Sequence, residues 1–326
     1  MIGDSTPCAR PPVNDDRPLL ALAYMLAAQF CFSTNILLLR ITEQSERAAL
    51  DPSFHLSPWE AMLCRSLLLS AWCFYKLRQG PVRRLEGKEN FWLWARGLSG
   101  VLSLSAYYYG VLHIPLGMAS LFSNSSPLYI TVLAIAFSGE TVNRWGALAL
   151  FGGFAGVGLV AWGAAHGIEG MALSAVLIAA LSGPLSATAY FSIRQLKRIR
   201  NEQIMMSLGL AGSLLAITAL CFKGEHFPRT GLAWFWLLLS SLPAIVAQEC
   251  LTRAFRAGPA SQVAPLQYTG PLFSCVLAWL FLQESIPALA LGGIAMVVAF
   301  GFCLPYWQAG KKLAALPAEE AAPGKR

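Results

Sequence analysis

"SLFSNSSPLYITVLAIAFSGE", residues 120–140, is a mostly apolar segment that carries the polar run Ser-Asn-Ser-Ser-Pro at 123–127. Its apolar part suits the hydrocarbon core of a membrane, which a helix crosses with about 20 such residues. Polar groups that face lipid are costly, and proline removes a backbone hydrogen bond from a helix. The polar run must therefore face something other than lipid, and the rest of the sequence indicates what that is.

The overall composition is that of a membrane protein with several spans. Of the 326 residues, 56% are hydrophobic and 13% are charged, whereas soluble proteins carry about 25% charged residues. The net charge of +7 would also suit a nucleic-acid-binding protein. Basic loops on the cytoplasmic side of a membrane explain it more simply, so we expect a lipid bilayer and no nucleic acid as partner.

Ten apolar runs are long enough to cross a bilayer as helices, whereas a membrane β-barrel would show shorter alternating segments. The runs cover 19–39, 58–75, 91–112, 118–138, 145–162, 171–191, 204–222, 232–251, 260–282 and 286–306. The first run is too long for a signal peptide and lacks a small-residue cleavage site, so we expect it to be retained. The tails, 1–17 and 308–326, are rich in Pro, Ala and charge, which predicts disorder.

The positions of Lys and Arg predict the orientation. With the N-terminus inside, 18 of the 24 cationic residues fall in cytoplasmic segments and four in outer loops, and Arg65 and Arg96 lie within runs. Because cytoplasmic loops carry an excess of Lys and Arg, this bias predicts that both termini are cytoplasmic.

The sequence also matches itself. A shift of 144 residues places Pro115 on Pro259, Pro127 on Pro271 and Glu140 on Glu284, with five apolar identities between them. Glu140 falls in a cytoplasmic loop and Glu284 in an outer loop, so the second half must be inverted. We expect an all-α membrane protein with two inverted five-helix repeats at 18–163 and 170–307, an architecture typical of secondary transporters.

The polar run therefore has a counterpart, "LQYTGPLF", at 266–273. Ser123, Asn124 and Pro127 share one helix face, and Gln267, Tyr268 and Pro271 occupy the matching face of the ninth helix. We expect these faces to line a water-filled cavity, with Pro127 and Pro271 as hinges. Hydrogen bonds between helices and a packing kink are the alternative.

Two stretches carry a family resemblance. "RGLSGVLSLSAYYYGVLHIPLGMASLFSNSSPLYITVLAIAFSGE" (96–140) and "AFRAGPASQVAPLQYTGPLFSCVLAWLFLQES" (254–285) resemble the EamA-type module of the drug/metabolite transporter superfamily. They share a short loop with proline, a helix with Ser-Pro or Gly-Pro, and an apolar run closed by Glu. The opening "RGL" is similar to that of solute carrier 35 group G-like proteins and S-adenosylmethionine uptake carriers.

The resemblance implies a ten-helix bundle whose first, third, fourth, sixth, eighth and ninth helices line a central cavity. It also implies transport of small organic metabolites without ATP hydrolysis. The second module has "QES" where "GE" is usual, so the ends of the fifth and tenth helices are less well defined.

Polar side chains recur at helical spacing on several of these helices, which predicts polar faces directed inward. With Arg65 and the interrupted helices, they form the expected substrate-binding set: Gln29, Ser33, Arg65, Arg96, Ser103, Tyr107, Ser123, Asn124, Ser186, Tyr190, Gln248, Glu249, Gln267 and Tyr268. Each stripe taken alone is also compatible with ordinary helix packing.

The charged members of this set have alternative interpretations. Arg65 lies about 10 Å inside the second helix and holds either a substrate carboxylate or a structural partner such as Glu249. Arg96 either faces the cavity or snorkels to the cytoplasmic edge. Glu249 is either a proton or cation site or the ion-pair partner of Arg253 one turn on. Glu140 and Glu284 are expected to be structural, at the start of the next helix.

We therefore predict a secondary transporter, with no cofactor, that moves an amino-acid-like or nucleoside-like metabolite by alternating access. We expect it in a bacterial inner membrane. A non-transporting assembly subunit is the alternative, and a membrane-embedded transferase is disfavoured because the runs hold no convergent acid–base pair or metal ligands. Gly152 and Gly156 allow close packing within the bundle or between two copies, which leaves a homodimer open.

Overall fold

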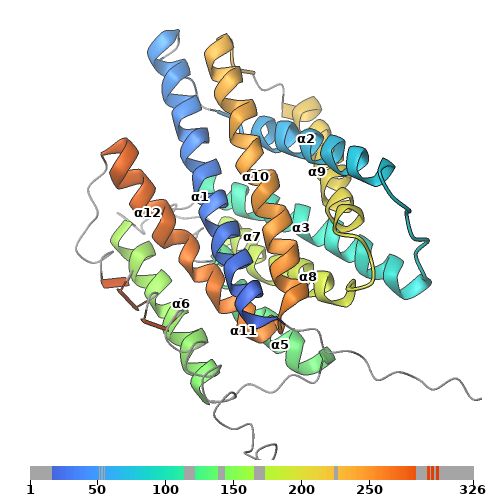
Figure 1. Ribbon diagram of the computed structural model, residues 1–326. Coiled ribbons are helices and arrows are strands. Elements are labelled where there is room, and N and C mark those ends of the chain that lie inside the picture. Colours follow the sequence, from blue (N-terminus) through green and yellow to red (C-terminus); the bar gives the residue numbers. More distant parts are fainter. Residues whose placement is uncertain are drawn as a thin grey trace, which may run out of the picture.

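The computed structural model describes residues 17–50, 52, 54, 56–113, 122–138, 144–164, 173–223 and 227–283, together with 292–293, 295–296 and 299–300. Every regular element within these ranges is a helix (Figure 1). Glu140, Glu284, nearly all of both tails and most of the expected tenth helix lie outside the described residues.

The helices follow one another as the apolar runs predict, with some runs divided. They are α1 (Pro18–Ala49), α2 (Pro58–Arg78), α3 (Gly87–His113), α5 (Ser126–Ser138), α6 (Arg144–Ala164), α7 (Leu173–Ala180), α8 (Ser182–Gln195), α9 (Asn201–Lys223), α10 (Gly231–Ala257), α11 (Ala260–Val263), the 3₁₀ helix η1 (Ala264–Tyr268) and α12 (Thr269–Leu282).

Within the part of the chain that the structure describes, five stretches are long and apolar enough to cross a membrane. These are Leu19–Ala49, Leu173–Gln195, Asn201–Phe222, Gly231–Ala257 and Ala264–Leu282, and Ser126–Phe137 is a shorter apolar helix. Large apolar side chains such as Leu67, Val132, Leu214 and Phe235 are exposed on the outside of the bundle. Such a surface is unfavourable in water and suits contact with lipid.

Helix α1 extends well beyond its predicted end at residue 39. Its 32 residues span about 48 Å at 1.5 Å per residue, which exceeds the hydrocarbon thickness of about 30 Å. The prediction was wrong at this end because hydropathy marks the limit of the apolar run and not the limit of the helix. The polar extension is held in place by Glu46, which is buried against the start of α10.

Polar side chains define two of the helix starts. At α2, Ser57 and Glu60 form a reciprocal capping box, and Pro58 occupies the first turn, where its missing N–H leaves no bond unmade. At α10, the Thr230 hydroxyl accepts a hydrogen bond from the Ala233 amide at 3.1 Å.

The contacts between helices join the first half of the chain to the second. Helix α1 packs along α10, α3 packs along α8, and α2 packs along α9; Figure 1 shows α1 and α10 side by side. The contact of α1 with α12 has a counterpart in the contact of α8 with α5. The two halves are therefore interlocked, and the core that includes Met25, Phe191 and Phe255 is built from both.

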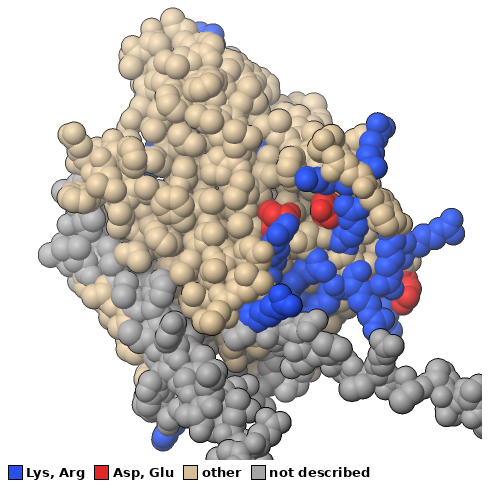
Figure 2. Space-filling view, in the orientation of Figure 1, with Lys and Arg blue, Asp and Glu red and all other residues tan. Residues whose placement is uncertain are grey.

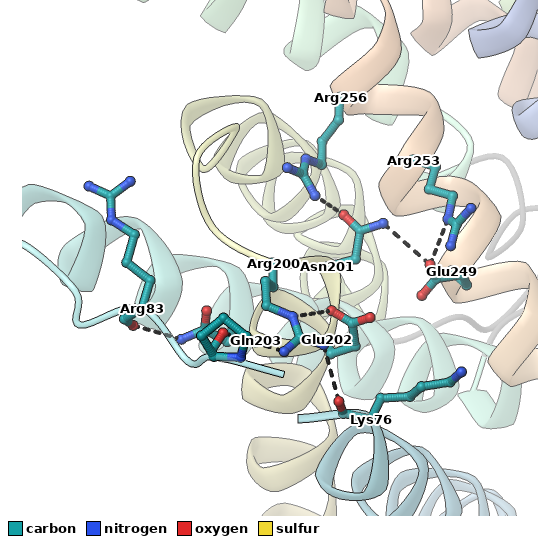
Figure 3. Close-up of polar contacts among 10 residues, drawn as sticks. Lys76, Arg83, Arg200, Asn201, Glu202, Gln203, Glu249, Arg253 and Arg256 are labelled. Atoms are coloured by element: carbon teal, nitrogen blue, oxygen red, sulfur yellow. Dashed lines mark hydrogen bonds and ion pairs between the residues drawn. The ribbon is translucent and has the colours of Figure 1, made fainter. Parts of the chain in front are cut away.

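The charged loops gather at one end of the bundle. Figure 2 shows Lys and Arg side chains concentrated in one region beside a few Asp and Glu, while the rest of the visible face is almost free of charge. In this region Arg200 Nη2 donates to the Lys76 carbonyl at 3.1 Å, and Gln203 Nε2 donates to the Arg83 carbonyl at 3.1 Å (Figure 3). The loops after α2 and α8, both predicted to be cytoplasmic, thus lie together.

Candidate functional site

The helix predicted over 118–138 is interrupted within the polar run at 123–127. Asn124 and Ser125 form a turn, and α5 starts at Ser126. The Ser125 hydroxyl donates to the Phe122 carbonyl at 2.6 Å, so a side chain satisfies a backbone group that the broken helix leaves open. Pro127 is buried in the first turn of α5, while Ser123 and Asn124 are half-buried.

The helix predicted over 260–282 is interrupted at the matching place. It divides into α11, η1 and α12, and η1 contains Gln267 and Tyr268. The Thr269 hydroxyl donates to the Leu266 carbonyl at 2.8 Å, which parallels the Ser125 bond. Pro271 is the third residue of α12.

A third interruption was not predicted. The run at 171–191 divides into α7 and α8 around Leu181, and the signal for it was the Gly183-Pro184 dipeptide. A Cβ atom on Gly183 would lie 2.2 Å from the Ser125 Oγ and 2.7 Å from the Phe122 carbonyl oxygen. The absence of a side chain at 183 therefore lets α8 rest directly on the turn before α5.

Several predicted site residues form hydrogen bonds between helices. Ser103 on α3 donates to the Ser182 carbonyl at 2.8 Å, and its Oγ lies 2.5 Å from that of Ser186. On the other side of the bundle, Ser33 donates to the Gly270 carbonyl at 3.0 Å. These serines occupy the crossings of α3 with α8 and of α1 with α12.

The polar residues near the second interruption are buried. Gln29 lies over Gly270, where a Cβ would meet its Oε1 at 2.6 Å. Gln267 and Tyr268 are both buried, and in the described part of the chain the Gln267 Nε2 and the Tyr268 hydroxyl have no hydrogen-bond partner. Tyr268 packs its ring against Gly153 of α6.

Arg65 on α2 and Arg96 on α3 lie close enough to interact electrostatically. Arg65 on α2 donates to Gln248 Oε1 at 3.4 Å and lies 5.6 Å from the centre of the Phe32 ring. Arg96 on α3 is 1% exposed and lies 6.0 Å from the centre of the Tyr190 ring. The two guanidinium groups interact electrostatically with each other and with Tyr190.

The surroundings of this arginine pair are aromatic. The rings of Tyr190 and Phe255 stack with centroids 5.5 Å apart. Tyr107 lies beside Tyr108, with ring centroids 5.8 Å apart, and packs toward α7. We define the central cluster as Phe32, Arg65, Arg96, Tyr190 and Gln248.

Some of the interpretations proposed for the charged residues are settled by these contacts. The burial of Arg96 shows that the snorkelling interpretation was wrong. Glu249 forms the ion pair with Arg253, at 2.6 Å, and also accepts from Asn201 Nδ2 at 3.3 Å (Figure 3). Arg65 bonds to Gln248 and not to Glu249.

Comparison with known proteins identifies the family. The sequence pattern of the EamA-like transporter family matches residues 19–162 and again residues 169–304. This chain belongs to the EamA-like transporter family. A transporter superfamily that includes EamA was the resemblance drawn from residues 96–140 and 254–285, and it is confirmed.

The relatives agree with this assignment. The pseudopaline exporter of Pseudomonas aeruginosa is 30% identical over 248 residues, which cover 74% of this chain and 84% of that protein. An uncharacterized transporter of Helicobacter pylori is 26% identical over 300 residues, which cover 88% of this chain and 94% of that protein. One solved crystal structure aligns with a TM-score of 0.74 at 18% identity, covering 92% of this chain and all of that one, which supports the fold alone.

Membership of the EamA family makes this chain a multi-pass membrane transporter and not an enzyme.

Proposed function

We propose that this EamA-family chain is a secondary transporter of a small organic metabolite and works by alternating access between two inverted five-helix repeats, 18–163 and 170–307. The substrate site lies between the repeats, near the middle of the membrane. The proposal keeps both termini on the cytoplasmic side and places the ten helices as the apolar runs predict.

The interrupted helices are the observation that carries this proposal. Irregular backbone at membrane depth is stable only where protein or water satisfies its polar groups, and transporters use such breaks at their binding sites. Here the breaks before α5 and before α12 fall in the polar runs that contain Pro127 and Pro271, which the 144-residue shift relates. Among the described residues, the amide nitrogen of buried Gln267 has no hydrogen-bond partner, as expected of a group that meets water or a ligand.

The contacts between helices support a one-to-one correspondence between the helices of the two repeats. If α8 corresponds to α1 and α10 to α3, then the contact of α1 with α10 is equivalent to that of α8 with α3. The contact of α1 with α12 is likewise equivalent to that of α8 with α5. The two separate matches to the EamA family pattern agree with this correspondence.

The charge distribution supports an orientation in the membrane, and the relatives support a direction and a location of transport. The basic loops that gather at one end (Figure 2) would face the cytoplasm according to the positive-inside rule. The similarity to a protein named as an exporter favours outward transport. Because the relatives are bacterial, we assign the chain to a bacterial inner membrane.

Counterflow in liposomes tests this function. The purified full-length protein would be reconstituted, loaded with unlabelled metabolite and screened for exchange of radiolabelled amino acids and nucleosides. We expect at least one of them to exchange above the rate in protein-free liposomes. Asn124→Leu and Gln267→Leu should each reduce this exchange at least fivefold at equal reconstitution.

Thr218→Leu is the matched control, because Thr218 is an exposed polar residue on the outside of α9. It should leave exchange unchanged. If neither Asn124→Leu nor Gln267→Leu affects exchange, the assignment of the interrupted helices to the substrate path is wrong. If no compound exchanges, the chain is better explained as a non-transporting assembly subunit.

A further inference from the structure

We propose that the central cluster is an anion site and that the transported metabolite carries a carboxylate, which Arg65, Arg96 and Gln248 bind. This inference rests on the transport function proposed above and narrows its substrate class. It favours an amino-acid-like substrate with an acidic group over a nucleoside-like one.

The charges of Arg65 and Arg96 favour an anionic ligand. An arginine inside a membrane protein is costly unless it is paired, and such residues normally mark a substrate or ion pathway. Neither Arg65 nor Arg96 forms an ion pair with any carboxylate among the residues that the structure describes. Glu249, the acidic residue next to Gln248 in sequence, is already engaged by Arg253 and Asn201. Two cationic groups thus converge without a described counter-ion.

Arg65 and Arg96 also lie at depth in the membrane. Arg65 lies seven residues into α2 and Arg96 lies nine residues into α3, which run in opposite directions through the bundle. At 1.5 Å per residue, these positions are about 10 Å and about 13 Å from opposite ends of the two helices. The apolar run of α3 begins only at residue 91, so Arg96 lies about 8 Å and Arg65 about 10 Å inside opposite faces of a hydrocarbon layer of about 30 Å.

The hydrogen-bonding groups of the central cluster also favour an anion. The Arg96 Nε and the Gln248 Nε2 are buried donors without a hydrogen-bond partner in the described part of the chain. The Gln248 Oε1 already accepts from Arg65 at 3.4 Å, and the unused Nε2 of the same amide is a donor available to a ligand. Buried polar groups rarely remain unpaired, and all the unused groups here are donors. A carboxylate, which only accepts and is matched by arginine in two-point contacts, is the complementary ligand.

The aromatic rings beside the two guanidinium groups favour an organic ligand. Phe32 lies under Arg65, and Tyr190 lies under Arg96 with Phe255 stacked behind it. Aromatic rings of this kind contact the organic body of a ligand and also hold the guanidinium groups by cation–π attraction. The cluster therefore suits an organic acid better than a small inorganic anion.

The test compares an acid with its amide in the counterflow assay. For each radiolabelled amino acid that exchanges, inhibition by the free acid is compared with inhibition by its primary carboxamide, for example L-phenylalanine and L-phenylalaninamide. We expect the acid to inhibit at least ten times more strongly. Arg65→Gln, Arg96→Gln and Gln248→Glu should each reduce this preference to threefold or less, the last by placing a carboxylate next to Arg65.

Two further variants separate binding from folding. Arg65→Lys keeps the charge and should retain part of the preference, although lysine cannot form the two-point contact. Arg84→Gln makes the same charge change in the exposed loop after α2 and should leave the preference intact. If Arg96→Gln does not yield monodisperse protein, Arg65→Gln and Gln248→Glu still decide the result.

The outcomes distinguish this inference from the function on which it rests. Exchange of nucleosides or amides without preference for the acid would overturn the anion site and leave the transport function standing. An unchanged preference in both Arg65→Gln and Gln248→Glu would overturn it as well. Absence of all exchange would instead count against the transport function.

Discussion

Glu46, near the end of α1, caps the start of α10 through Thr230. Its carboxylate accepts hydrogen bonds from the backbone amides of Arg229 at 2.8 Å and Thr230 at 3.1 Å, and from the Thr230 hydroxyl. At the opposite ends of the same helices, the Arg17 amide donates to the Ala257 carbonyl at 2.6 Å. The long antiparallel pair of α1 and α10 is thereby fixed at both ends.

The first prediction concerns this cap. Glu46→Ala leaves the two amides and the hydroxyl without their acceptor, and hydrogen bonds to a charged group contribute about 1.5–3 kcal/mol. We expect a loss of stability in this range, measured as a lower Tm of the purified protein in detergent. Glu43→Ala is the control: its pair with Arg47 is partly exposed, and such pairs contribute about 0–1 kcal/mol. An equal Tm for Glu46→Ala and Glu43→Ala would contradict the capping role.

The second prediction concerns the charged end of the bundle. Arg200 donates to the carbonyls of Lys76 and Pro81, at 3.1 Å and 3.4 Å, and pairs with Glu202 at 3.2 Å (Figure 3). It thus connects the start of α9 to the loop between α2 and α3. Arg200→Ala should release this loop and increase tryptic cleavage after residues 83 and 84 several-fold in inside-out vesicles.

Arg198→Ala is the matched control for this experiment, because it also removes one tryptic site and Arg198 is exposed. It should leave cleavage of the loop unchanged. Equal cleavage in Arg198→Ala and Arg200→Ala would show that Arg200 does not hold the loop.

The third prediction concerns Gly183. Its missing side chain allows α8 to approach the turn at 122–125, and a Cβ would lie well inside contact distance of a backbone oxygen there. Overpacking of this kind typically costs about 1–3 kcal/mol. Gly183→Ala should therefore lower the Tm and slow counterflow, whereas Gly87→Ala, with nothing within 4 Å of the added Cβ, should do neither. A fully active, equally stable Gly183→Ala protein would show that this approach is unimportant.

The sequence predicted those features that depend on local chemistry. Pro127 and Pro271 were predicted as hinges because proline removes a backbone hydrogen bond from a helix, and the breaks before α5 and before α12 lie next to them. The ion pair of Glu249 with Arg253 was one of two interpretations offered, because residues four apart always meet on a helix. The break at Leu181 was not predicted. The Gly183-Pro184 dipeptide that follows it is not preceded by a polar run as long as those before Pro127 and Pro271.

Other features depend on contacts between distant segments. Arg96 is buried because the ring of Tyr190 lies beside it and because Gly100 leaves room for its guanidinium group, where a Cβ would meet Nη1 at 2.5 Å. Neither condition can be read from the spacing around residue 96. Glu249 was one of the alternatives offered as a partner for Arg65, beside a substrate carboxylate, but the residue on α10 that Arg65 contacts is the preceding one, Gln248.

The last prediction concerns the inversion of the repeats, which requires that equivalent residues face opposite compartments. In a variant whose eight native cysteines are replaced by serine, Glu140→Cys should react with a membrane-impermeant maleimide only from the cytoplasmic side. Glu284→Cys should react only from the outside. Arg84→Cys and Arg229→Cys, in exposed loops at the two ends of the bundle, provide the inner and outer references. If positions 140 and 284 label from the same side, the two halves are parallel, and the alternating-access mechanism loses its structural basis.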